Sequence, residues 1–346
     1  MKVRTLWAIH KWAGLVFGSL LFLVLFTGTV AVFKEEIDWA VTPALRVTPR
    51  DRLASIDDVL RAAGAAASGV VMPADPATAY TVYVGAKQVF VDPYTARVTG
   101  SREGEHLANV IRQAHARFYF FGWQGRVFVG FLGFALLASA VTGLLIYGPF
   151  LRGVFAQGKR WWQIREGFQL ATSDWHKLIG VASLALNIVW ASTGAVLGLE
   201  NLLRYTPELS KTIHRTPSAK TSPEDRPKIG GDAALAAAKL ALPGLQPTSL
   251  LLPSPKSGHY TIYGNIGGHF ARHAANWALI GAYDGRTVAV SDSRTVSGGV
   301  RVYDWMEPLH FGDFAGTGVK LLYLLFALAS SALPITGFVL WWTKRT

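Results

Sequence analysis

The chain has 346 residues, of which 51% are hydrophobic and 16% charged, and its mean hydropathy is +0.27. About a quarter of the residues of a soluble globular protein are charged, so this composition excludes a wholly soluble protein. The net charge of +12 raises nucleic acid as a partner, but the basic residues flank apolar stretches, and we expect no nucleic-acid binding. The chain has no cysteine, which excludes disulfides, iron–sulfur clusters, thiolate zinc sites and covalent haem attachment.

Four windows without a charged residue organise the chain: 12–33, 127–151, 178–199 and 321–343. A bilayer core of about 30 Å needs about 20 apolar residues in a helix, so each window is long enough to cross it. We therefore predict a multi-pass membrane protein in contact with the lipid bilayer. The first window is longer than the apolar region of a signal peptide and no A-x-A site follows it, so we expect a retained span.

The short segments beside the windows are rich in basic residues: Lys2, Arg4, Arg152, Lys159, Arg160, Arg165, Lys344 and Arg345. The positive-inside rule places such segments in the cytoplasm. Both termini are then cytoplasmic, and the two long segments, roughly 35–126 and 200–316, lie on the opposite side of the membrane.

The two halves of the chain repeat one pattern. At a shift of 166 positions, His10, Lys11, Gly14, Thr27 and Gly28 align with His176, Lys177, Gly180, Thr193 and Gly194. Residues 115–148 and 310–342 also align, on Thr142-Gly143 and Thr336-Gly337. We predict a mainly α protein, a four-helix transmembrane bundle built from a two-span repeat. We expect the Thr-Gly pairs to mark close helix contacts, with each threonine bonded to its own helix, and assign them no chemistry.

The long segments are predicted to be two small α+β modules. Ser55 is a candidate N-cap for a helix over 55–67, and residues 79–100 alternate as strands do, with turns at 85–87 and 92–93. The second long segment shows the same pattern, with a helix predicted over 230–242, strands over 259–264 and 277–292, and a turn at Asp284-Gly285. Residues 206–228 are expected to be a polar connector.

Four histidines stand at the ends of the predicted spans. His10 and His176 lie at the cytoplasmic ends, and His115 and His310 lie near the opposite face. One histidine at a helix end is commonly an interfacial residue with its ring among the headgroups. Here, however, the two histidines at each face come from different repeats, so facing pairs His10–His176 and His115–His310 are expected. Two facing imidazoles suit the axial positions of a b-type haem, and we predict two haem b groups.

Basic residues close to these histidines are candidate partners for haem propionates: Lys11, Lys177, Arg126 and Lys320. Contact with lipid headgroups explains the same residues equally well. His269 and His273 have an i,i+4 spacing that would suit a metal ion on a helix, but the glycines before them favour a loop.

Several stretches resemble the PepSY-associated transmembrane family, and within it the inner-membrane ferrisiderophore reductases. They are His10-Lys11-Trp12-x-Gly14, "VFVDPYTARVTG" (89–100), "LHFGDFAGTGVK" (309–320) and "TGFVLWWTKR" (336–345). The resemblance covers nearly the whole chain, although Ala96 stands where the family often has glycine in the turn. It implies a bacterial inner-membrane protein with periplasmic PepSY-like modules and haem ligands at His10, His115, His176 and His310. It further implies electron delivery, from a cytoplasmic donor or the quinol pool, to a periplasmic ferric siderophore, which releases ferrous iron.

The expected organisation divides the chain at the ends of the predicted spans. Spans one to four occupy 1–34, 115–149, 175–200 and 310–346, the modules occupy 35–114 and 201–309, and a cytoplasmic loop occupies 150–174. Two other functions remain open at this point. One is a haem-containing quinol or metal reductase of the cytochrome b561 type, and the other is a haemless PepSY protein that regulates or scaffolds a partner.

Overall fold

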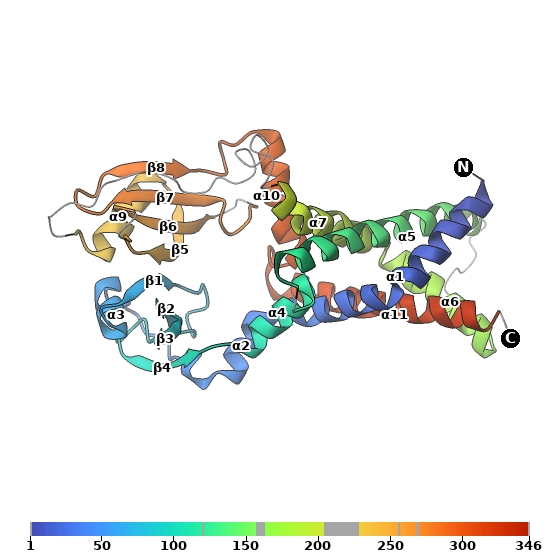
Figure 1. Cartoon of the computed structure of the whole chain (residues 1–346), viewed down its shortest axis with the longest axis horizontal. Helices are drawn as coiled ribbons and strands as arrows, with labels where there is room; N and C mark the ends of the chain where they lie inside the picture. The colour runs from blue at the N-terminus through green and yellow to red at the C-terminus, as the bar shows by residue number, and fades with distance from the viewer. Residues whose placement is uncertain are drawn as a thin grey trace. The chain divides into compact units, whose positions relative to one another are not determined.

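The computed structural model describes residues 2–119, 121–156, 163–203, 228–254, 257–267 and 270–344. The chain divides into two units (Figure 1). One contains Met1–Lys34, Leu107–Ser210 and Met306–Thr346, and the other contains Glu35–His106 and Lys211–Trp305. Apart from Lys228, the connector expected over 206–228 lies outside the described residues.

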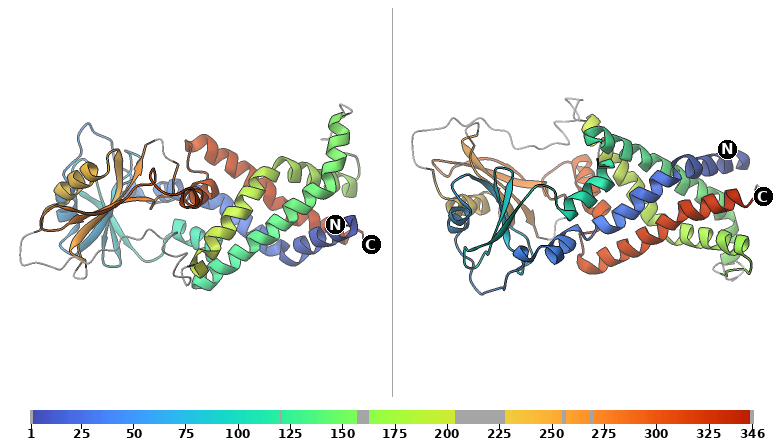
Figure 2. Two further views of the ribbon diagram at one scale, coloured as in Figure 1. Left: turned by 90° about the horizontal axis from the view of Figure 1, so that it is seen from above. Right: turned by 60° about the horizontal axis from the view of Figure 1, so that its bottom comes forward.

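The first unit is helical. Its helices are α1 (Val3–Ala31), α4 (Leu107–Arg117), α5 (Gly122–Ala156), α6 (Phe168–Ala182), α7 (Leu184–Leu203) and α11 (Gly316–Trp342), and α10 (Gly298–Phe311) precedes α11. Helices α1, α5 and α11 are each long and apolar enough to cross a membrane, and α6 and α7 are so only as a bent pair. The described residues therefore hold three candidate spans, or four if the bent pair is one span. The long helices run side by side in both views of Figure 2.

The span predicted over 175–200 is not one continuous helix, because α6 and α7 meet at Ser183 with a bend of 64°. The Ser183 hydroxyl donates to the Ile179 carbonyl at 2.7 Å and accepts from the Asn187 amide at 2.8 Å. A serine that bonds to its own helix competes with the backbone ladder and bends the helix.

Small residues let α5 and α7 approach closely. A Cβ atom added to Gly130 would lie 2.9 Å from the Cα of Gly198, and one added to Gly133 would lie 2.7 Å from the Ala191 carbonyl oxygen. Such contacts between glycine and alanine faces are the usual means of packing helices within a membrane.

The second unit is built on one antiparallel sheet. Its strands are β1 (Ala67–Val71), β2 (Tyr80–Val84), β3 (Lys87–Val91), β4 (Val98–Glu103), β5 (Leu245–Leu251), β6 (His259–Ile266), β7 (Asn276–Gly281) and β8 (Thr287–Ser291). Their order is β4-β3-β2-β1-β5-β6-β7-β8. Strands β1 and β5 pair with Val70 opposite Leu250. The two expected modules thus contribute four strands each to a continuous eight-stranded sheet.

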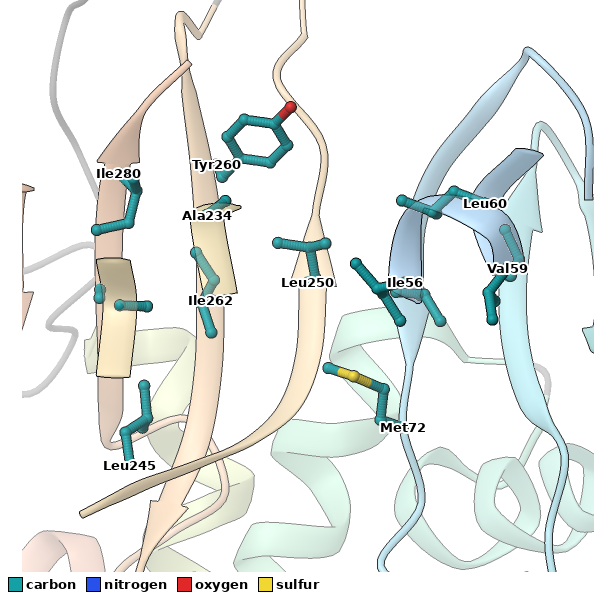
Figure 3. Packing of buried hydrophobic residues seen from close by; sticks show 14 of the residues in the cluster. Ile56, Val59, Leu60, Met72, Ala234, Leu245, Leu250, Tyr260, Ile262 and Ile280 are labelled. Atoms are coloured by element: carbon teal, nitrogen blue, oxygen red, sulfur yellow. The ribbon is translucent and has the colours of Figure 1, made fainter. Parts of the chain in front are cut away.

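Helices α3 (Ile56–Ala63) and α9 (Gly231–Ala241) belong with the sheet core. Ile56, Val59 and Leu60 of α3 belong to one buried cluster with Leu250, Ile262 and other residues of the strands (Figure 3). A smaller cluster of Leu45, Ala79 and Phe90 packs beside η1 (Pro43–Leu45) and Trp39 of α2 (Lys34–Val41). Burying such aliphatic side chains is the main stabilisation of the unit.

Local signals in the sequence account for several elements of this unit. Ser55 caps α3, since its hydroxyl accepts from the Asp58 backbone N–H at 3.0 Å. The Asp284-Gly285 turn lies between β7 and β8, with Gly285 at φ 67°. Ala96 takes φ 53° in the turn between β3 and β4, a left-handed conformation that glycine adopts at lower cost.

Two ion pairs are largely buried in this unit. Asp304 is 1% exposed and accepts from Arg272 at 3.1 Å. Asp38 accepts two bonds from Arg102, at 2.6 and 2.8 Å. Burial opposes ionisation of Asp38, but the hydrogen bonds and the charge of Arg102 outweigh it, so its pKa lies below the ordinary value.

Candidate functional site

The helical unit brings the four span-end histidines together as two pairs. His10 of α1 faces His176 of α6, with ring centroids 6.2 Å apart and ring planes at 90°. His115 of α4 faces His310 of α10, with centroids 6.0 Å apart and planes at 38°. Each pair joins one residue from each half of the chain, as the sequence repeat predicted.

The separation within each pair matches two imidazoles that share one metal ion. A metal binds an imidazole nitrogen at about 2 Å, and that nitrogen lies about 1 Å from the ring centre, so the two centroids lie about 6 Å apart. Both pairs meet this requirement. Within the described residues, no group of three or more His, Cys, Asp or Glu side chains gathers as a metal site. The site is therefore a paired-imidazole arrangement, which differs from a multi-ligand zinc site.

Every ring is held through its Nδ1 atom. The Nδ1 of His10 lies 3.0 Å from the Ser139 carbonyl oxygen, and that of His115 lies 2.9 Å from the Val24 carbonyl oxygen. His176 Nδ1 lies 2.8 Å from Thr336 Oγ1, and His310 Nδ1 lies 2.9 Å from Thr193 Oγ1. His10 Nδ1 also lies 3.2 Å from Thr142 Oγ1, and the Leu333 backbone contributes a further hydrogen bond to His176.

The opposite ring atom, Nε2, makes no hydrogen bond to any described residue in these four histidines. A histidine that ligates a metal usually donates its other N–H to a carbonyl or similar acceptor, which fixes the orientation of the ring. The observed bonds at Nδ1 have this form and leave Nε2 available to a metal. The residues present thus fit a haem, whose iron the two imidazoles of a pair would bind.

Each ring also lies against the glycine of a Thr-Gly pair. A Cβ atom added to Gly28 would lie 2.8 Å from Cε1 of His115, and one added to Gly194 would lie 3.1 Å from Cε1 of His310. A Cβ atom added to Gly143 would lie 3.3 Å from Cε1 of His10, and one added to Gly337 would lie 3.5 Å from Cε1 of His176. The threonines do bond back to their own helices, as expected. Each Thr-Gly pair contributes to the cradle of one histidine, a contact that the sequence did not predict.

Burial keeps the rings of the His115–His310 pair neutral. It lowers the pKa of His115. Burial, together with repulsion from His115, lowers the pKa of His310 to about 3. A neutral imidazole has the free lone pair that metal binding requires.

The candidate propionate partners have protein contacts of their own. Lys177 lies 3.2 Å from Asp174, which also binds Arg165, and Arg126 lies 3.5 Å from Glu200. Lys11 places its ammonium 5.0 Å from the centre of the Trp12 ring, and Lys320 is in the first turns of α11. Of the candidate metal pair, His269 lies outside the described residues and His273 lies in a turn, which does not provide helical i,i+4 geometry.

Sequence reasoning missed the hydrogen-bond acceptors of the histidine rings and the acidic partners of the basic residues. The acceptors Ser139 and Val24 act through backbone carbonyls, which leave no trace in residue type. For Asp174 the available signal was its place three residues before Lys177. Glu200 is 74 positions from Arg126, so no local pattern links the two.

The chain is 27% identical over 250 residues to the uncharacterized protein PA4219 of Pseudomonas aeruginosa. That alignment covers 65% of this chain and 61% of the relative, so the chain matches less than two thirds of the length of that protein. The pattern of the PepSY-associated TM region matches residues 7–344. The chain belongs to the PepSY-associated transmembrane family.

Proposed function

We propose that the protein is a dihaem b oxidoreductase of the bacterial inner membrane that passes electrons to a periplasmic ferric siderophore. The observation that carries the proposal is the pairing of His10 with His176 and of His115 with His310, each at the spacing of two ligands on one iron. Haem b at each pair would supply one-electron chemistry, the cycling of its iron between the ferric and ferrous states.

The two histidine pairs lie at opposite ends of the helices. Helix α1 carries His10 near its start, and Gly28, which contacts His115, is 18 residues further along. At 1.5 Å per residue this is about 27 Å, close to the thickness of a bilayer core. This separation supports the proposal that one haem would lie near each membrane face, in a bundle of four spans if α6 and α7 form one span. By the positive-inside rule the His10–His176 pair is on the cytoplasmic side.

The chain residues have distinct parts in this function. The four histidines bind and orient the two haems, and the Thr-Gly pairs and backbone carbonyls fix the rings. Lys11, Lys177, Arg126 and Lys320 are the basic residues proposed for the propionates, within charge networks that include Asp174 and Glu200. The cytoplasmic donor or quinol would meet the His10–His176 end, and the ferric siderophore would meet the His115–His310 end, where ferrous iron is released.

Anaerobic mixing tests the proposal. The purified, dithionite-reduced protein is freed of excess reductant and mixed with a ferric hydroxamate siderophore, while haem absorbance and a ferrous-iron indicator are recorded. We expect haem reoxidation with one ferrous ion formed per electron. His310→Ala should lose the haem at that end and most of the rate, whereas His259→Gln, a change at a buried histidine of the sheet unit, should retain both.

The outcomes separate this function from its alternatives. Reoxidation by quinone, with none by any ferric siderophore, would favour the b561-type reductase. A purified protein without haem absorption would favour a haemless regulatory or scaffold protein. Equal siderophore rates in His310→Ala and wild type would contradict the assigned electron exit.

A further inference from the structure

The two histidines of the His115–His310 pair are held by chemically different acceptors. His115 Nδ1 reaches the Val24 carbonyl at 2.9 Å, and His310 Nδ1 reaches the Thr193 hydroxyl at 2.9 Å. In the other pair, His176 Nδ1 lies 2.8 Å from the Thr336 hydroxyl, while His10 Nδ1 lies 3.0 Å from the Ser139 carbonyl and 3.2 Å from the Thr142 hydroxyl. The Thr27 hydroxyl, at the position that aligns with Thr193, bonds to the Leu23 and Val24 carbonyls of its own helix.

The direction of the threonine bonds follows from the hydroxyl proton. Thr193 donates to the Val189 carbonyl at 2.6 Å, and Thr336 donates to the Ala332 carbonyl at 2.9 Å. A hydroxyl has one proton to donate and two lone pairs that accept. With its proton in the bond to its own helix, each threonine accepts from the imidazole. The ring proton of His176 and of His310 is then on Nδ1, and the lone pair is on Nε2.

A bond from Nδ1–H to an acceptor makes Nε2 a stronger donor to a metal. Stronger donation stabilises the more highly charged ferric iron over the ferrous form and lowers the reduction potential. We propose that Thr193 and Thr336 are positioning residues which fix the tautomer of His310 and His176 and set the reduction potentials of the two haem sites. This inference rests on the proposed haem-binding function.

The matched test compares Thr193→Val with Thr27→Val, the aligned position in the first half. Valine has the shape of threonine but no acceptor, so Thr193→Val removes the hydroxyl that accepts from His310. The Thr27 hydroxyl bonds to Leu23 and Val24 carbonyls, while His115 uses the Val24 carbonyl itself, so Thr27→Val leaves that histidine bond in place. Thr142→Val is a weaker control, because it removes a hydroxyl 3.2 Å from His10 Nδ1 but leaves the Ser139 carbonyl at 3.0 Å in place.

The measurement is a spectroelectrochemical titration of each variant with both haems bound. Loss of one hydrogen bond is expected to change the ratio of ferric to ferrous stability roughly three- to tenfold, which raises one midpoint potential by about 30 to 60 mV. Thr193→Val should show this rise at one haem only, Thr193→Ser should restore the wild-type value, and Thr27→Val should show less than a third of it.

Each result decides between distinct conclusions. Thr193→Val with two haems and unchanged potentials would overturn the inference and leave the proposed function intact. Wild-type protein without haem would overturn the proposed function itself. If Thr193→Val loses a haem, recovery of that haem and its potential in Thr193→Ser supports the role of the hydroxyl, and failure to recover overturns it.

Discussion

Alanine substitutions at the four cradle glycines should weaken haem retention in a set order. The added Cβ atom would lie 2.8 Å from the facing imidazole at Gly28, 3.1 Å at Gly194, 3.3 Å at Gly143 and 3.5 Å at Gly337. Favourable carbon contacts lie at about 3.5–4.0 Å. The ring must therefore move by about 0.7 Å or more at Gly28, while at Gly337 it can stay in place.

The consequence at Gly28 can be estimated from the contacts of His115. Its Nδ1 lies 2.9 Å from the Val24 carbonyl oxygen, so a shift of about 0.7 Å takes this bond to the limit of hydrogen-bond geometry. Overpacking costs about 1–3 kcal/mol, and alanine in a helix offsets up to about 1 kcal/mol of it. A net cost near 1.4 kcal/mol lowers haem affinity about tenfold.

Haem retention during size-exclusion chromatography in detergent, measured as haem per chain, is the assay. The matched control is Gly148→Ala in α5, where the added Cβ would meet only Leu144, at 3.9 Å. We expect retention to fall in the order Gly337→Ala, Gly143→Ala, Gly194→Ala, Gly28→Ala, with the control equal to wild type. The reasoning is refuted if Gly28→Ala retains as much haem as Gly337→Ala in folded protein.

Three further outcomes are expected. The two haems should give distinct low-spin ferric signals in electron paramagnetic resonance. The rings are perpendicular at His10–His176 and tilted at His115–His310, so they split the iron orbitals differently. One signal of double intensity would contradict this geometry. Asp38→Asn should destabilise the sheet unit by about 1–3 kcal/mol, measured by thermal unfolding, since it removes a charged partner of Arg102. The folded-state pKa of Asp38 lies below 3.8, so this ion pair stabilises the unit above that pH. Its contribution is lost as the pH falls through the lowered pKa. If Asp38→Asn loses as much stability on acidification as the wild type, Asp38 is not the group responsible.

The histidine pairing was accessible from the sequence because a repeated pattern placed His10 and His176 at the same position of two apolar segments. His10 and His176 share a register of 166 positions, and this register survives in the helices that carry them. The strands over 79–100 were also accessible, because alternating residues mark the strands and turn residues mark their ends. In both cases a local pattern in the sequence was enough to predict the element.

Other features depend on contacts that residue type does not reveal. The pairing of β1 with β5 is a main-chain contact between distant segments, and nothing in "ASGVV" specifies its partner. The bend at Ser183 arises from a local hydrogen-bond choice within an apolar window. The Thr-Gly pairs were recognised as repeats, but their contact with histidines requires knowing which helices are neighbours.

The measurement that tests the central claim most directly is the haem content of the purified chain. The account predicts two b-type haems per chain, with His176→Ala and His310→Ala each retaining one, and the double variant retaining none. A wild-type chain that binds no haem, or single variants that each keep two, would contradict the claim that these four imidazoles hold two irons.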